Sequence, residues 1–170
     1  MNTILVPTDF SVRSEYAARY AVEMASEIKA NVLLFNAIEV PERVLASTTV
    51  TAWPVLNYSA MKEESLLDLK ALAERIKSSV PENAVFKPSI TYKNDFGFIA
   101  DLVNTIVLEN RVGLIIMSAH RTNSISRFFL GCDTHDLLDK ALCPVIIIPE
   151  NMTFRTINKI SYATSRGCKD

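Results

Sequence analysis

The chain has 170 residues, of which 49% are apolar and 22% are charged, and its formal net charge at pH 7 is −1. This length and composition are typical of a single globular domain. A charge so close to zero provides no broad attraction to nucleic acid or to an anionic membrane, and no apolar run approaches the ~18–20 residues of a membrane span. We therefore expect neither nucleic acid nor a membrane as a partner.

Residues 1–3 lead directly into an apolar run that predicts the first strand. They lack the basic segment of a signal peptide, so we expect no signal peptide. The three cysteines, Cys132, Cys143 and Cys168, are odd in number and lack the spacing of a metal site or a redox pair. Unpaired thiols are typical of a reducing compartment. These features predict a cytoplasmic protein.

Apolar runs alternate with helical patterns over the first 149 residues. The runs are unbroken, which is typical of parallel strands covered on both faces, and the helical patterns carry apolar residues at i, i+3 and i+4. We predict strands at Ile4–Val6, Val32–Phe35, Val85–Tyr92, Leu114–Met117 and Pro144–Pro149, and helices after Ser11, from about Ser59 to Pro81, after Gly97, and from Cys132 to Leu142. Five strands alternating strictly with four helices predict an α/β fold with a doubly wound parallel sheet.

Two finer predictions concern the core and the sheet edge. The first two helices should bury stripes that comprise Tyr16, Ala17, Tyr20, Ala21, Met24, Ala25 and Ile28, and Leu66, Leu69, Leu72 and Ile76. The third predicted strand contains Pro88, which has no N–H to donate to a neighbouring strand. We therefore expect it at an edge of the sheet.

Two segments do not follow the alternation. Residues 38–57 contain few charges and the single tryptophan, Trp53, and a connection of this length is either functional or mobile. The sequence leaves open whether it is a lid, a partner surface or a locally packed loop. In the tail, residues 150–170, the stretch Asn158–Ser165 resembles Asn2–Asp9 and predicts a second short strand and turn. Because no helix follows, we expect this strand to be disordered or recruited to a sheet edge.

The stretch from the fourth strand to the fourth helix is the best candidate for a ligand site. Ligands of open α/β sheets bind at the carboxyl ends of the strands, and a helix N-terminus there favours an anion. Met117-Ser118-Ala119-His120-Arg121 follows the strand, and Gly131-Cys132-Asp133-Thr134 opens the helix. Neither His120 nor His135 has acidic or cysteine partners at metal-ligand spacing, so we assign no catalytic and no metal-binding residue.

These pieces together resemble the universal stress protein family over residues 1–149. The resemblance is carried by the opening Ile4–Ser11, the closing Cys143–Pro149, and Met117–Thr134 between them. It implies a Rossmann-like fold of the adenine nucleotide alpha hydrolase type, with strand order 3-2-1-4-5, and a homodimer paired through the fifth strand, Val145–Ile148. It also implies that the tail is the start of a second domain, as in tandem members of the family.

Many members of the family bind ATP through Gly-x-x-Gly, nine residues, and then Gly-Ser or Gly-Thr. This spacing is kept here, but Ser118 and Arg121 replace the two glycines and Cys132 replaces the hydroxyl residue, whereas Gly131 is kept. His120 matches the usual loop histidine. The positions that the resemblance assigns to the nucleotide site are Pro7, Thr8, Asp9 (beside the nucleoside), Ala37 (beside the adenine), Met117, Ser118, His120, Arg121, Gly131, Cys132, Asp133 and Thr134.

The substitutions remove what a phosphate loop needs. Glycine permits positive φ and close approach of the backbone to phosphate, which a Cβ obstructs, and a thiol is a weak hydrogen-bond donor. The resemblance and these substitutions together imply a non-enzymatic regulatory dimer of the stress response that has lost ordinary ATP binding and has no cofactor, and that senses a small-molecule or nucleotide ligand. Because the guanidinium of Arg121 pairs well with phosphate, the alternative is an ATP-binding module with retained or slow hydrolysis, using Asp9, Arg121 and Gly131.

Overall fold

A computed structural model describes residues 3–39, 57–118 and 132–161, without the side chains of residues 132–134. The segment 40–56, which includes Trp53, lies outside the described residues. The elements are β1 (Thr3–Pro7), α1 (Val12–Ile28), β2 (Asn31–Ile38), α2 (Tyr58–Lys77), β3 (Ile90–Phe96), α3 (Ile99–Glu109), β4 (Val112–Ser118), α4 (Cys132–Lys140) and β5 (Val145–Ile148). Within these ranges, no helix is long and apolar enough to cross a membrane.

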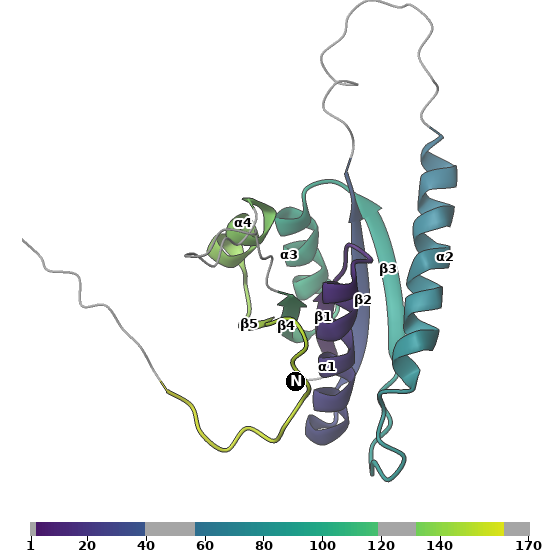
Figure 1. Cartoon of the computed structure of the whole chain (residues 1–170). Helices are drawn as coiled ribbons and strands as arrows, with labels where there is room; N and C mark the ends of the chain where they lie inside the picture. The colour runs from purple at the N-terminus through teal and green to yellow at the C-terminus, as the bar shows by residue number, and fades with distance from the viewer. Residues whose placement is uncertain (1–2, 40–56, 119–131, 162–170) are drawn as a thin grey trace, which may run out of the picture.

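The five strands form one parallel sheet in the order β3-β2-β1-β4-β5. The predicted fold class and strand order are confirmed. Figure 1 shows α1 and α2 on one face of this sheet and α3 and α4 on the other. Because the sheet is covered on both faces, its central strands bury side chains on both sides, which explains the unbroken apolar runs in the sequence.

The central strand β1 contributes to both layers of the core. Ile4, Leu5 and Val6 are all 0% exposed. Since successive side chains of a strand point to opposite faces, Ile4 and Val6 pack with residues of α1 and α2, while Leu5 packs with residues of α3 and α4. The sheet thus has one hydrophobic cluster on each face, and β1 contributes side chains to both.

The predicted third strand lies too early in the chain. β3 begins at Ile90, so Pro88 precedes it, and Val85 is 97% exposed. The predicted edge position is correct, but its cause is different. β3 lies at the edge because the chain crosses from β1 to β2 and then to β3 in one direction, and its residues alternate between half-buried and exposed, as expected where one face meets solvent.

The residues of the predicted helix stripes are buried or half-buried, except Leu66 and Ile28. Leu69, Leu72 and Ile76 are buried, but Leu66 is 38% exposed, and Ile28 at the end of α1 is 41% exposed. In α2 the buried position one turn before Leu69 is Ser65. Because Ser65 and Leu69 are four residues apart, they share one face of the helix, and Leu66 lies to its side.

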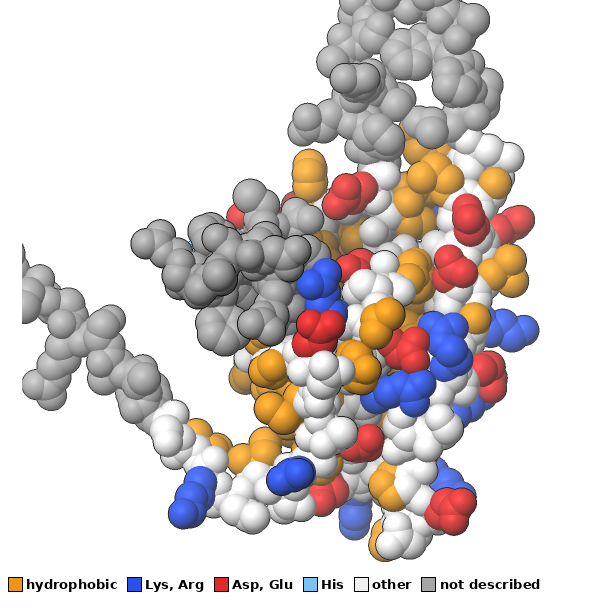
Figure 2. Space-filling view, viewed as in Figure 1, with side chains coloured by type: hydrophobic (Ala, Val, Ile, Leu, Met, Phe, Trp, Pro, Cys, Tyr) orange, Lys and Arg blue, Asp and Glu red, His pale blue; other side chains and the backbone are white. Residues whose placement is uncertain are grey.

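An ion cluster joins the outer surfaces of α1 and α2. Glu15 pairs with Arg19 at 2.7 Å and with Arg75 of α2 at 3.0 Å. Partial burial acts to raise the pKa of the Glu15 carboxyl, but hydrogen bonds and charge interactions with Arg19 and Arg75 outweigh it and lower the pKa below its usual value. Figure 2 shows acidic and basic side chains interspersed over this face, in keeping with the small net charge.

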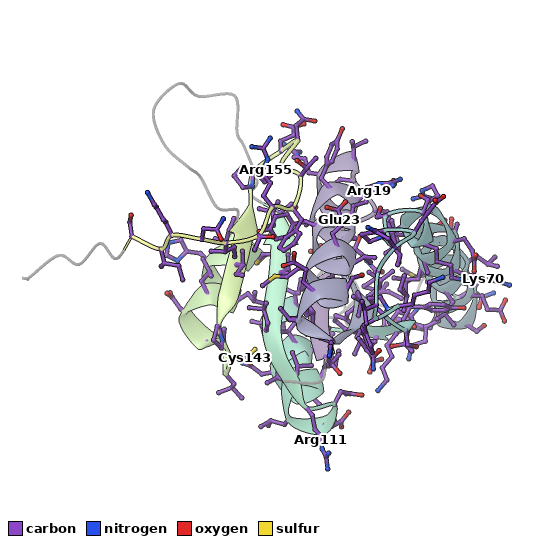
Figure 3. All side chains as sticks on the ribbon, turned by 90° about the horizontal axis from the view of Figure 1, so that it is seen from below. Arg19, Glu23, Lys70, Arg111, Cys143 and Arg155 are labelled. Atoms are coloured by element: carbon purple, nitrogen blue, oxygen red, sulfur yellow. The ribbon has the colours of Figure 1, made fainter. Side chains whose placement is uncertain are left out.

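The described part of the tail, residues 150–161, crosses α1 without forming a helix or a strand. Phe154 packs edge-on against Tyr20, with ring centroids 5.2 Å apart, and its N–H donates to Glu23 Oε2 at 3.3 Å. Thr156 Oγ1 donates to Glu27 Oε1 at 2.9 Å. Figure 3 shows this segment passing Glu23. The strand predicted from Asn158 is therefore absent as far as Ser161, and residues 162–170 lie outside the described part.

Candidate functional site

The sheet brings the first predicted site residues to one edge. β1, β2 and β4 are parallel neighbours, so Pro7, Ala37 and the pair Met117–Ser118 lie at their common carboxyl end. The chain leaves β1 toward β2 on one side, while β4 lies on the other side. The strand order therefore reverses between β1 and β4, and ligands of open α/β sheets bind at such a position.

The predicted phosphate loop is described only at its two ends. Met117, at the end of β4, is 7% exposed, and the next residue, Ser118, is half-buried. His120, Arg121 and Gly131 lie outside the described residues. Cys132, Asp133 and Thr134 form the first turn of α4, whose backbone N–H groups are the ones that a helix N-terminus leaves unpaired.

The Thr8 side chain stabilises the turn that joins β1 to α1. This side chain is buried, its Oγ1 lies 2.9 Å from Ser14 Oγ, and the same Oγ1 accepts the Phe10 N–H at 3.1 Å. These bonds hold Phe10 in the left-handed region, with φ of 61°. A bulky residue adopts this conformation only when its surroundings impose it, so the turn has one defined shape.

Asp9 projects from this turn into solvent at the carboxyl edge. Its Oδ1 accepts the Ser11 N–H at 3.0 Å, whereas the cap of α1 is Ser11, whose Oγ accepts the Ser14 N–H. Shielding by the turn acts to raise the pKa of Asp9, but hydrogen bonds from Ser11 and Ser14 outweigh it and lower the pKa below its usual value. Asp9 is thus a carboxylate at neutral pH, which suits it to accept hydrogen bonds from sugar hydroxyls.

Two residues that the sequence analysis missed support the turn from the side of β2 and α2. The Asn36 amide donates to the Thr8 carbonyl oxygen at 2.8 Å, and its Oδ1 accepts the Ser65 hydroxyl at 2.9 Å. A sequence signal for Asn36 exists, since it is an amide within the apolar run of β2. Ser65 gives no such signal, because a serine in an amphipathic helix is unremarkable.

The hydroxyl groups beside Asp9 are hydrogen-bonded within the β1–α1 turn. Thr8, Ser11 and Ser14 hydrogen-bond to one another and to backbone groups, and within the described ranges no histidine or lysine contacts their hydroxyls. Among the same residues, no group of three or more His, Cys, Asp or Glu side chains could hold a metal ion. Burial raises the pKa of the Cys143 thiol, which makes it less reactive.

Comparison with known proteins agrees with this architecture. The model of the universal stress protein family matches residues 1–149. The universal stress protein UspA from Lactobacillus plantarum is 21% identical, with a TM-score of 0.63, over 86% of this chain and 97% of that one. At this sequence identity, the similarity to a solved structure establishes the fold. No curated protein sequence matches the chain significantly.

Two further structures of similar fold contain nucleotides. A universal stress protein in complex with cAMP is 16% identical, with a TM-score of 0.62, over 87% of this chain and 96% of that one. The universal stress protein from Archaeoglobus fulgidus in complex with dAMP is 18% identical, with a TM-score of 0.53, over 86% of this chain and 96% of that one.

Proposed function

Because the chain belongs to the universal stress protein family, we propose that it is a non-enzymatic stress-response protein that binds an adenine nucleotide with one phosphate group in preference to ATP. The observation that carries this proposal is the β1–α1 turn. Its backbone is held by the buried Thr8 side chain, and it presents the carboxylate of Asp9 at the edge of the sheet. This is the half of the site that receives the nucleoside in the family pattern.

The other half of the site, which receives the phosphates in the family pattern, carries substitutions that favour a ligand with fewer phosphate groups. Ser118 and Arg121 place side chains where glycines would let the backbone approach a chain of phosphates. The guanidinium of Arg121 can instead pair with one phosphate group through two parallel hydrogen bonds. The two nucleotides held by the similar structures, cAMP and dAMP, each carry an adenine and a single phosphate.

The proposed role is binding without turnover. The hydroxyls nearest Asp9 donate to or accept from one another and the backbone. A hydroxyl becomes an effective nucleophile only beside a general base. The ligand would therefore act by shifting the populations of protein conformations, which requires only a difference in affinity between them.

Calorimetric titration with AMP and with ATP tests this proposal. We expect AMP to bind at least about tenfold more tightly than ATP, and Asp9→Asn to weaken AMP binding about tenfold, as expected for a hydrogen bond to a charged group. Asp101→Asn is the matched control, because Asp101 is an exposed carboxylate in the first turn of α3. Failure of AMP to bind, or an unchanged affinity in Asp9→Asn, would contradict the proposal.

The alternative function is an ATP-binding module with slow hydrolysis. The spacing from Ser118 through Arg121 to Gly131 favours it, because this is the family spacing and Arg121 carries a charge suited to phosphate. In the same titrations, this alternative requires ATP to bind more tightly than AMP. It further requires release of inorganic phosphate at a rate that Arg121→Ala changes.

We also propose that the protein acts as a homodimer in the cytoplasm, paired through β5. This strand occupies one end of the sheet, and Val145, Ile146 and Ile147 are only half-buried. An unpaired apolar edge strand is a template for pairing with another chain. Sedimentation equilibrium should give twice the mass of one chain, and a monomer throughout the accessible concentration range would exclude this interface.

The proposed domain organisation is one stress-protein unit at 1–149 followed by the start of a second unit at 150–170. Its support is the similarity of Asn158–Ser165 to Asn2–Asp9. β1, which is the strand within residues 2–9, is buried between two helical layers. The described residues 158–161 form no strand.

A further inference from the structure

Asn36 is the one polar side chain in the described core of β2 that bonds to two other elements at once. It lies between Phe35, which is 1% exposed, and the half-buried Ala37. Its amide donates to the Thr8 carbonyl oxygen of the β1–α1 turn, and its Oδ1 accepts the hydroxyl of Ser65 in α2. A hydrogen-bonded amide in an apolar strand contributes little net stability, so its contribution is chiefly to geometry.

The Asn36 bonds belong to a longer polar chain. Ser65 is 7% exposed, Thr8 is 6% exposed and Ser14 is 2% exposed. Through Thr8, which bonds Ser14 by its side chain and Asn36 by its carbonyl, the chain runs from α2 through β2 to α1. Within the described residues, no buried side-chain nitrogen or oxygen lacks a hydrogen-bond partner. Each group in the chain therefore constrains the orientation of the next.

The first part of α2 is held to β3 by polar contacts and by an aromatic contact, in which the rings of Tyr58 and Phe96 lie edge to face with centroids 5.1 Å apart. The apolar residues that α2 buries begin only at Leu69. Before it, Asn94 of β3 donates to the Lys62 carbonyl oxygen at 2.8 Å, and Lys62 pairs with Asp95 at 2.9 Å. Ser65 is the residue through which this part of α2 reaches the β1–α1 turn. Figure 1 shows α2 running alongside β3, with β2 between β3 and β1.

We infer that Asn36 is the positioning residue of the nucleotide site and that Ser65 sets its orientation, so that the hydrogen bond between Ser65 and Asn36 is coupled to ligand binding. This inference rests on the proposed function. The Ser65 hydroxyl donates to the amide oxygen and thereby directs the amide nitrogen toward the Thr8 carbonyl. The Thr8 peptide in turn precedes Asp9, whose carboxylate meets the ligand. The coupling is reciprocal: bound ligand stabilises the hydrogen bond between Ser65 and Asn36.

Two substitutions test the two contacts of Asn36 separately: the hydrogen bond to the Thr8 carbonyl and the hydrogen bond from Ser65. Asn36→Asp keeps an acceptor for Ser65 and places a carboxylate oxygen against the Thr8 carbonyl. Ser65→Ala removes only the hydrogen bond between α2 and Asn36. Asn94→Ala is the matched control, because Asn94 also binds α2 to a strand but makes no contact with the turn. Ser65→Thr, which keeps the hydroxyl, is the rescue variant.

The first readout needs no ligand. NMR hydrogen exchange follows the amides of Phe10 and Ser11, which donate to Thr8 Oγ1 and to Asp9 Oδ1. We expect exchange about tenfold faster in Asn36→Asp and about fivefold faster in Ser65→Ala, as for the loss of one hydrogen bond. Asn94→Ala and Ser65→Thr should stay within about twofold of the unmodified protein. Unchanged exchange of both amides in Ser65→Ala, a conservative substitution that leaves the core intact, would overturn the inference.

The second readout is AMP affinity by calorimetry. We expect binding to weaken about tenfold in Asn36→Asp and about fivefold in Ser65→Ala, with Asn94→Ala unaffected. If the unmodified protein fails to bind AMP while the Phe10 and Ser11 amides respond as expected, the proposed ligand is wrong and the positioning role of Asn36 stands. If AMP binds the unmodified protein and all variants alike, the positioning role is wrong and the proposed function stands.

Discussion

Restoring the family residues at the phosphate loop should convert the site to one that prefers ATP. In the triple variant Ser118→Gly, Arg121→Gly and Cys132→Ser, two Cβ atoms no longer obstruct the backbone, and a hydroxyl replaces a weakly donating thiol. One regained hydrogen bond to a charged phosphate corresponds to about tenfold in affinity, so we expect ATP to bind at least about tenfold more tightly than to the unmodified protein. Calorimetric titration measures this gain directly.

The same variant should bind AMP no better, because it loses the guanidinium that we assign to the single phosphate. The preference between the two nucleotides therefore reverses. Arg127→Gly is the control, since it removes an arginine from the same segment at a position outside the Gly-x-x-Gly spacing, and it should leave both affinities within about twofold. An ATP affinity that is unchanged in the triple variant would show that these three side chains are not what disfavours ATP.

Truncation of Ile116 should cause the largest loss of stability of the variants considered. Ile116 is 0% exposed and lies in β4, between β1 and β5, where it packs in the cluster formed with α1 and α2. Ile116→Ala removes three buried carbon atoms and leaves a cavity in a layer that cannot collapse easily. We expect the free energy of unfolding to fall by about 3–4 kcal/mol.

Urea unfolding followed by circular dichroism measures this loss as a lower midpoint with a similar slope. Ile160→Ala is the matched control, because the same atoms are removed from a side chain that is 88% exposed in the tail. Its free energy of unfolding should change by less than about 0.5 kcal/mol. Equal effects of the two substitutions would contradict the assignment of Ile116 to the core.

Much of the fold could be predicted from the residues, because each central strand contains an unbroken apolar run. Leu114–Met117 and Val32–Phe35 read as buried strands and lie within β4 and β2. The first helix is predicted to follow Ser11, and the Ser11 side chain caps that helix by accepting the Ser14 N–H. The strand order, in contrast, followed from the family resemblance, since no local pattern specifies which strands are neighbours.

Predictions failed where burial depends on a distant neighbour. Val85 and Pro88 precede β3 because the partner of this edge strand, β2, pairs first with Ile90. Leu66 is partly exposed because the sheet meets α2 through Ser65. Apolar content alone could not distinguish these cases, since an edge strand or a surface helix is only partly covered, and its neighbours decide which residues are buried.

The unbroken strands, the helical stripes and the changes in the predicted phosphate loop can be recognised from the residues alone, because each of them depends on one short stretch of the chain. The support of the β1–α1 turn, in contrast, depends on the three-dimensional fold. Thr8, Asn36 and Ser65 belong to a loop, a strand and a helix that are far apart in the chain, and two hydrogen bonds join them. Such contacts arise when parallel strands end at one edge of a sheet, which no spacing along the chain encodes.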